Sequence, residues 1–162
     1  MPGGRGETEP LDFDEMTIHF YSTRGEFGFL SNFAACPITL KGKLWPTTEH
    51  YFQAQKFAGT EHEEATRQAK SPMVAARMGR SRKRPLRPDW ESVKDDVMRE
   101  ALYAKFTQHT ELLAALLATG DAPLVEHKAR DRYWADGGDG SGQNRLGVLL
   151  MALRGELREA AG

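Results

Sequence analysis

The sequence predicts a compact single domain of the α+β class, mostly helical, with a small β-sheet near its N-terminus. Three features of the 162-residue chain support this prediction. Short apolar segments precede residue 46, capping residues and helical spacing dominate from residue 47 onward, and neither a repeat nor a linker divides the chain. We expect the domain to span residues 15–160. Residues 1–14, rich in Gly, Pro and acid, are expected to form a disordered tail.

The predicted strands are short. Apolar and polar residues alternate over 16–21, which is the pattern of a half-buried strand. Residues 38–40 and 44–45 flank Lys41-Gly42-Lys43, which predicts a hairpin. A further short strand is expected at 124–127.

The helices are predicted from their starting residues and from apolar periodicity. Thr47 and Thr60 are N-cap residues, and Ser71-Pro72 combines an N-cap with a proline at the first helical position. Leucines in the C-terminal segment fall on one stripe, as in a helix that faces the core. The expected helices cover about residues 48–58, 61–70, 72–79, 90–107, 110–119 and 143–159.

Composition excludes several functional classes. A formal net charge of −1 does not predict nucleic-acid or membrane binding. Cys36 is the single cysteine, which rules out an internal disulfide and fits a reducing compartment. The histidines lack metal-site spacing, apolar runs are shorter than the ~18 residues of a membrane span, and the N-terminus lacks a signal-peptide core. We therefore expect a cytoplasmic protein without a metal or cofactor.

The segment from Trp45 to Phe57 carries the first candidate site. On a helix, Glu49, Gln53 and Lys56 share one face, and Glu49 and Lys56 lie about 10.5 Å apart along the axis. That separation suits two groups that hold a ligand between them. In the alternative interpretation, Glu49 complements the helix dipole and Lys56 is solvated.

The second candidate site is the segment with Glu126, Asp131 and Trp134, followed by two further acids, Asp136 and Asp139. Such a Gly- and acid-rich segment is often an exposed connector, and it lacks the spacing of a calcium loop. Its last part, 140–144, leads into the C-terminal helix. Glycines at a helix start offer free backbone N–H groups, which predicts a phosphate site there.

The third feature is the basic segment Arg80–Arg87. It is either a solvated loop or a clamp for a phosphate or a nucleic-acid backbone. Trp90 follows, and it either stacks on a base or seals the core.

These blocks, in this order, resemble the YbiA-like (NADAR) family over about residues 18–158. The matching pieces are Phe20-Tyr21, Phe27-Gly28-Phe29-Leu30-Ser31-Asn32-Phe33, Trp45-Pro46-Thr47-Thr48-Glu49-His50-Tyr51-Phe52-Gln53-Ala54-Gln55-Lys56-Phe57, Gly79-Arg80, Trp90, Leu124-Val125-Glu126, Asp131-Arg132-Tyr133-Trp134 and Gly142-Gln143-Asn144-Arg145-Leu146-Gly147.

The resemblance implies a YbiA-like fold and a hydrolase that cleaves the N-glycosidic bond between ribose and a base or aminopyrimidine. Two substrate classes are implied: phosphorylated intermediates of riboflavin synthesis, and ADP-ribose on guanine in nucleic acid. It places Glu49, Trp90 and Asp131 in the active site, with Lys56 and Trp134 close by. The complete set of candidate substrate-binding residues is Trp90, Trp134, Phe29, Asn32, Arg24, Gly142 and Asn144.

Competing hypotheses stay open at this point. In the first, Glu49 or Asp131 stabilises the oxocarbenium-like cation and the other transfers a proton, or Lys56 captures the open-chain ribose as a Schiff base. In the second, the same pocket is a non-catalytic reader of ADP-ribose, and in the third the chain is a structural or toxin-neutralising interaction protein. The sequence does not predict an oligomeric state.

Overall fold

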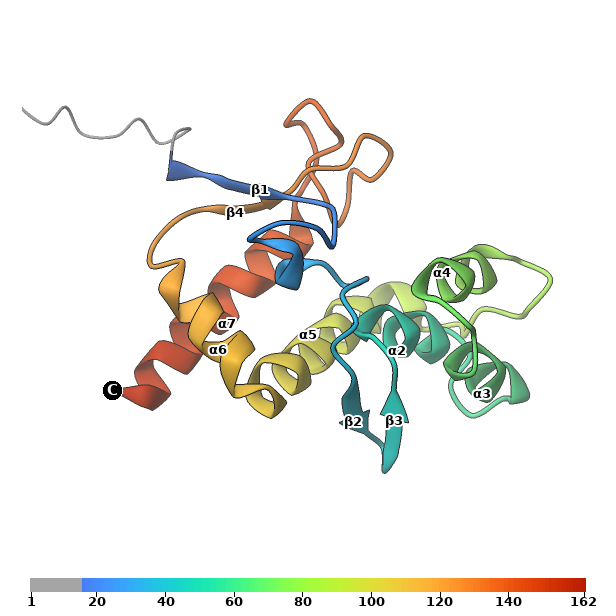
Figure 1. Cartoon of the computed structure of the whole chain (residues 1–162). Coiled ribbons are helices and arrows are strands. Elements are labelled where there is room, and N and C mark those ends of the chain that lie inside the picture. Colours follow the sequence, from blue (N-terminus) through green and yellow to red (C-terminus); the bar gives the residue numbers. More distant parts are fainter. Residues whose placement is uncertain (1–15) are drawn as a thin grey trace, which may run out of the picture.

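The computed structural model describes residues 16–162, and the predicted tail at 1–14 lies outside this range. Helices pack around the long α5, and two small strand pairs flank them (Figure 1). The predicted α+β fold class is confirmed. The elements are β1 (Ile18–Phe20), the 3-10 turn η1 (Gly28–Leu30), β2 (Ile38–Leu40), β3 (Lys43–Trp45), α2 (Thr48–Gln55), α3 (Glu61–Arg67), α4 (Pro72–Arg80), α5 (Trp90–Gln108), α6 (Thr110–Ala118), β4 (Leu124–Glu126) and α7 (Arg145–Ala161).

The strands form two separate pairs rather than one N-terminal sheet. The antiparallel β2–β3 hairpin aligns Ile38 with Trp45, and its turn places Lys41 at a φ of 55°. The other pair is parallel, with β4 in register beside β1 so that Phe20 lies opposite Glu126. Residues about a hundred positions apart therefore meet at one end of the molecule.

The helix starts follow the predicted capping residues. The side chains of Thr47, Thr60 and Ser71 accept hydrogen bonds from the backbone N–H groups of the first turns of α2, α3 and α4. The C-terminal helix begins two residues later than predicted because Asn144 adopts a left-handed conformation, with φ 50° and ψ 44°. A residue in that region cannot continue a right-handed helix.

Helix α5 lies at the centre of the core. Its buried residues Met98, Leu102 and Phe106 pack in one cluster with side chains from α2, α6, α7 and the strands. Lys105, on the same helix, is almost fully buried and donates a hydrogen bond from Nζ to the Ser31 carbonyl oxygen at 3.0 Å. This bond fixes the loop after η1 against α5 and so positions one wall of the cavity described below.

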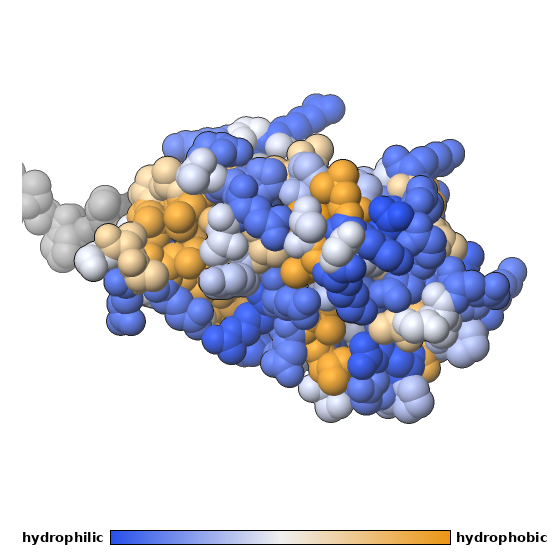
Figure 2. Space-filling view, turned by 90° about the horizontal axis from the view of Figure 1, so that it is seen from below, coloured by the Kyte–Doolittle hydropathy of each residue, from blue (hydrophilic) through white to orange (hydrophobic). Residues whose placement is uncertain are grey.

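The surface seen from below is mostly hydrophilic, with apolar residues in separate patches (Figure 2). Among residues 16–162, no helix is both long and apolar enough to cross a bilayer.

Candidate active site

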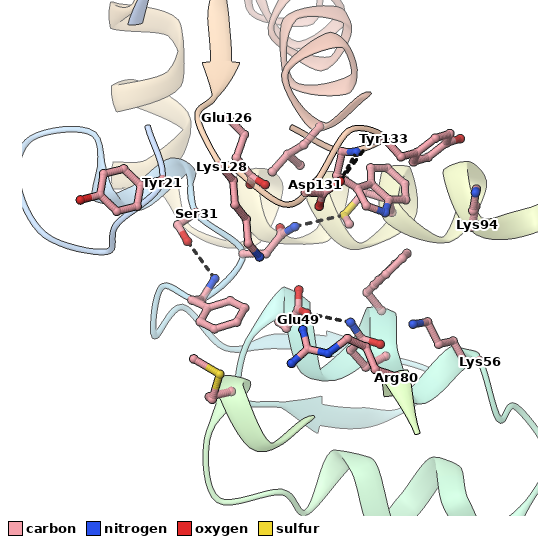
Figure 3. Close-up of a pocket in the computed structure, with 18 of the residues that line it drawn as sticks. Tyr21, Ser31, Glu49, Lys56, Arg80, Lys94, Glu126, Lys128, Asp131 and Tyr133 are labelled. Carbon is pink, nitrogen blue, oxygen red and sulfur yellow. Dashed lines mark hydrogen bonds between the residues drawn. The ribbon is translucent and has the colours of Figure 1, made fainter. Parts of the chain in front are cut away.

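A cavity of about 600 Å³ separates α2 and the end of α4 from β4 and the segment that follows it (Figure 3). This volume lies within the range of sites for small ligands. Acidic, basic and aromatic side chains share the lining. The charged residues that line it are Glu49, Glu91, Glu126, Asp131, Lys56, Arg80, Lys94 and Lys128.

Glu49 lies in the first turn of α2 and is 8% exposed. Its backbone N–H donates to the Asn32 carbonyl oxygen at 3.2 Å, and its Oε1 accepts from Gln53 Nε2 at 2.8 Å. Burial raises the pKa of the Glu49 carboxyl. The Gln53 hydrogen bond and the nearby cations Lys128, Lys56 and Arg80 oppose this rise. Glu49 is therefore a desolvated carboxyl with positive charge around it.

Asp131 lies on the opposite wall, in the segment between β4 and α7 (Figure 3). Its Oδ1 accepts backbone hydrogen bonds from Tyr133 at 3.1 Å and Trp134 at 2.8 Å, and its carbonyl oxygen accepts from Gly137 at 3.0 Å. The fold thus fixes the orientation of the Asp131 carboxyl at the cavity wall.

Lys56 follows the last turn of α2 and faces the same cavity. Its Nζ lies 3.4 Å from the Gly79 carbonyl oxygen and 5.8 Å from the ring centres of both Phe52 and Trp90. Burial and the positive charge of Arg82 lower the pKa of the Lys56 amine to about 8. A neutral amine is consequently accessible near physiological pH, which an ordinary lysine does not provide.

Aromatic rings line the cavity between these charged groups. Phe52 packs against Trp90 with ring centres 5.1 Å apart and against Trp134 at 5.3 Å, edge to face. Trp90 is 5% exposed, so it both seals the core and contributes to the cavity wall. The two predicted tryptophans therefore meet through a phenylalanine and offer apolar surface to a flat ligand.

Asn32 also lines the cavity, but its amide is engaged in the fold. Its Oδ1 accepts from Thr48 Oγ1 at 2.8 Å, and its Nδ2 lies 3.4 Å from Met98 Sδ. Asn32 therefore joins the η1 loop to α2 and α5, and its contribution to the site is mainly to fix that wall.

Four of the predicted substrate-binding residues, Phe29, Arg24, Gly142 and Asn144, lie outside the cavity lining. Phe29 packs edge to face on Phe106, and Arg24 lies on an exposed loop. A Cβ on Gly142 would meet the Ala135 carbonyl oxygen at 2.3 Å, so this glycine permits close loop packing. Asn144 joins β4 to α7 through its side-chain amide.

The predicted phosphate site at the start of α7 has its donors occupied. Backbone N–H groups of residues 142–146 donate to carbonyl oxygens of the preceding segment, 132–136, at 2.8–3.1 Å. The Ser141 N–H donates to Asp139 Oδ1 at 3.0 Å. The chain folds back on the start of α7, so these N–H groups are not free to bind a phosphate.

The cavity lining also contains residues that are not among the predicted site residues, Lys94 and Lys128 among them. Lys94 lies four residues after Trp90, so helical periodicity places both on one face of α5. Lys128 lies two residues after Glu126, so the alternation of an extended chain predicts that both face the same side. Lys94 Nζ lies 3.8 Å from the centre of the Tyr133 ring and 2.6 Å from Glu91 Oε2. Within residues 16–162, no cluster of three or more His, Cys, Asp or Glu side chains is placed to hold a metal ion.

Comparison with known proteins agrees with this chemistry. Residues 19–158 match the model of the NADAR domain family. The chain is 63% identical over 140 residues to the N-glycosidase YbiA of Escherichia coli (strain K12), covering 86% of this chain and 88% of that protein. A solved NMR structure of E. coli YbiA superposes with a TM-score of 0.83 at 61% identity, covering 90% of this chain and 86% of that one.

A riboflavin biosynthesis protein of Vibrio vulnificus is 45% identical over 147 residues. The match covers 91% of this chain but 40% of that longer protein.

Proposed function

Because the chain belongs to the NADAR domain family and is an N-glycosidase, we propose that it hydrolyses the N-glycosidic bond of phosphorylated ribosylamino-pyrimidines, the intermediates of riboflavin synthesis. The observation that carries the proposal is the placement of Glu49 and Asp131 on opposite walls of one aromatic-lined cavity. The riboflavin-related name of the Vibrio relative supports the substrate class.

The two carboxylates supply the electrostatics of the reaction. Cleavage of a ribosyl C–N bond builds positive charge on C1′ and the ring oxygen, and a nearby fixed anion lowers that barrier. Two backbone N–H groups fix the Asp131 carboxyl in place, and Glu49 is desolvated, so a negative charge on Glu49 acts strongly across the cavity. Trp90, Trp134 and Phe52 offer apolar surface to the base.

Basic side chains in the cavity, rather than the start of α7, bind the phosphate of the substrate. Arg80, Lys94 and Lys128 line the cavity, and the first two contribute to the positive potential felt by Lys56. Such side chains bind phosphate through charge-assisted hydrogen bonds.

The experiment that tests the substrate class compares kcat/KM for a ribosylamino-pyrimidine 5′-phosphate with kcat/KM for the same compound without its phosphate. We expect the phosphate to raise kcat/KM at least tenfold, and equal values would contradict the proposed site.

Lys56 supports a covalent route within the same reaction. A buried amine among other cations is the arrangement that activates lysine as a nucleophile, because both effects favour its neutral form. We expect borohydride treatment during turnover to trap a ribosyl adduct on Lys56, read by peptide mass spectrometry. Lys56→Arg is the matched control, since it keeps the charge and cannot form the imine. Full activity of the wild-type enzyme with no adduct would refute the covalent route.

A second candidate function is removal of ADP-ribose from guanine in nucleic acid. The observation that favours it is the basic segment Arg80–Arg87, which continues from the cavity wall at Arg80. Arg82 serves the cavity indirectly, because its guanidinium donates to the Gly79 carbonyl oxygen that Lys56 also contacts. Lys83 and Arg84 are therefore the informative positions for a contact with a longer substrate.

Replacing Lys83 and Arg84 together by Ser is expected to leave hydrolysis of a small nucleotide within twofold of wild type. The same change is expected to lower kcat/KM severalfold on an ADP-ribosylated oligonucleotide, with a smaller loss at high salt, because exposed charges are screened. The double variant Arg99→Ser/Arg158→Ser, on α5 and α7 outside the lining, matches the charge change. Loss on both substrates would instead place the segment in the small-molecule site.

A further inference from the structure

The backbone of Glu126 is fixed on both sides. It is the last residue of β4, its N–H donates to Asn144 Oδ1 at 3.0 Å, and its carbonyl oxygen accepts from the Asp136 N–H at 2.9 Å. Parallel pairing places Phe20 beside it on β1. These contacts direct the Glu126 side chain into the cavity, where its carboxyl lies near that of Asp131 (Figure 3).

The Glu126 carboxyl differs from its two neighbours in hydrogen bonding. Asp131 receives two backbone N–H groups and Glu49 receives the Gln53 amide. Among the residues that the structure describes, none donates a hydrogen bond to the Glu126 carboxyl. Since such donors stabilise the charged form, Glu126 is the member of the trio whose negative charge is supported by the fewest hydrogen bonds.

Most of the charges that face Glu126 are negative. Negative charge on Asp131, Glu49 and Asp136 disfavours ionisation of Glu126, and the positive charge of Lys128 favours it. Burial first, and Asp131 second, raise the pKa of the Glu126 carboxyl to about 7. Carboxyls that share one site do not all ionise at neutral pH, and Glu126 lacks, within residues 16–162, the hydrogen-bond donors that would favour loss of its proton.

We infer that Glu126 is the proton donor of the reaction, a role that rests on the proposed N-glycosidase function. The C1′–N bond breaks, its electron pair goes to the nitrogen, and that nitrogen takes the proton of Glu126 as the amine leaves. Lys56 or water forms the new bond to C1′. The water that finally releases the sugar supplies its oxygen, and its surplus proton returns to Glu126, so each cycle consumes one water.

The role predicts a specific pH dependence. A donor must be protonated, so its contribution is present below pH 7 and is lost as pH rises through about 7. We expect Glu126→Gln to lower kcat at least tenfold with little change in KM, and to remove the corresponding fall in kcat/KM. Glu126→Asp keeps a carboxyl and is expected to restore part of the activity. Glu111→Gln, at an exposed position of α6, is the control.

The titration is also measured without substrate, by NMR on protein with ¹³C-labelled Glu carboxyls. The resonance missing from Glu126→Gln identifies Glu126, and we expect its midpoint near 7. A midpoint below about 5, as in an ordinary glutamate, or wild-type activity in Glu126→Gln, would overturn the inference. The midpoint is measured in the free protein, so it tests the Glu126 inference independently of substrate. Failure to hydrolyse the ribosylamino-pyrimidine phosphate would refute the proposed function and leave the midpoint unaffected.

Discussion

Replacing Glu49 by Gln is expected to lower kcat by about 10²-fold or more while the fold is kept. Loss of one preorganised electrostatic contact to a developing charge costs about 3 kcal/mol of transition-state stabilisation. Gln has nearly the shape of Glu, and its amide oxygen can still accept the Gln53 hydrogen bond that Glu49 receives at 2.8 Å. The melting temperature should therefore stay close to that of wild type, and only turnover should fall.

The control for this variant is Glu61→Gln. Glu61 also lies in the first turn of a helix, α3, but its side chain is 89% exposed and it does not line the cavity. If Glu49 only complements the helix dipole, both substitutions should cost a few tenths of a kcal/mol in stability and leave activity unchanged. Equal, near-wild-type turnover in the two variants would remove Glu49 from the reaction.

Asp131→Asn is expected to be equally damaging to kcat, with nucleotide binding nearly unchanged. The variant loses the negative charge, but its Oδ1 can keep the hydrogen bonds from the Tyr133 and Trp134 N–H groups, so the segment should hold its shape. The charge acts mainly in the transition state, and a loss there lowers kcat without raising KM. Steady-state kinetics measure the effect of the substitution on kcat and KM, and the dissociation constant of the product measures its effect on nucleotide binding.

Asp139→Asn is the matched control for Asp131→Asn. Asp139 makes the same kind of local turn contact, accepting from the Ser141 N–H at 3.0 Å, but it is exposed and lies outside the cavity lining. A purely structural role for Asp131 predicts similar, small effects in both variants. A raised KM with unchanged kcat in Asp131→Asn would place this residue in ground-state binding.

Local features of the fold could be predicted from the sequence because their contacts are local. Thr47, Thr60 and Ser71 cap helices through hydrogen bonds to residues two or three positions away. A few neighbouring residues therefore determine where each helix starts. The shared face of Glu49 and Lys56 likewise follows from helical periodicity, and both residues line the cavity.

Features that depend on distant segments could not be predicted. Nothing in the residues of β1 and β4 specifies that they pair in parallel, and this pairing places Glu126 in the cavity. The glycines of segment 140–144 predict a helix start with free backbone N–H donors. The chain instead folds back, and residues 132–136 occupy the N–H groups that a phosphate would need.

The most direct test of the account is the stoichiometry of product release from a ribosylamino-pyrimidine 5′-phosphate. Wild-type enzyme is expected to release free aminopyrimidine and ribose 5-phosphate in equal amounts over many turnovers, measured together by chromatography and mass spectrometry. The double variant Glu49→Gln/Asp131→Asn should bind the compound and release neither product. If wild type binds this compound, or ADP-ribose, tightly and releases no base from it or from ADP-ribosylated guanine, the cavity is a nucleotide-binding site without catalysis and the account is contradicted.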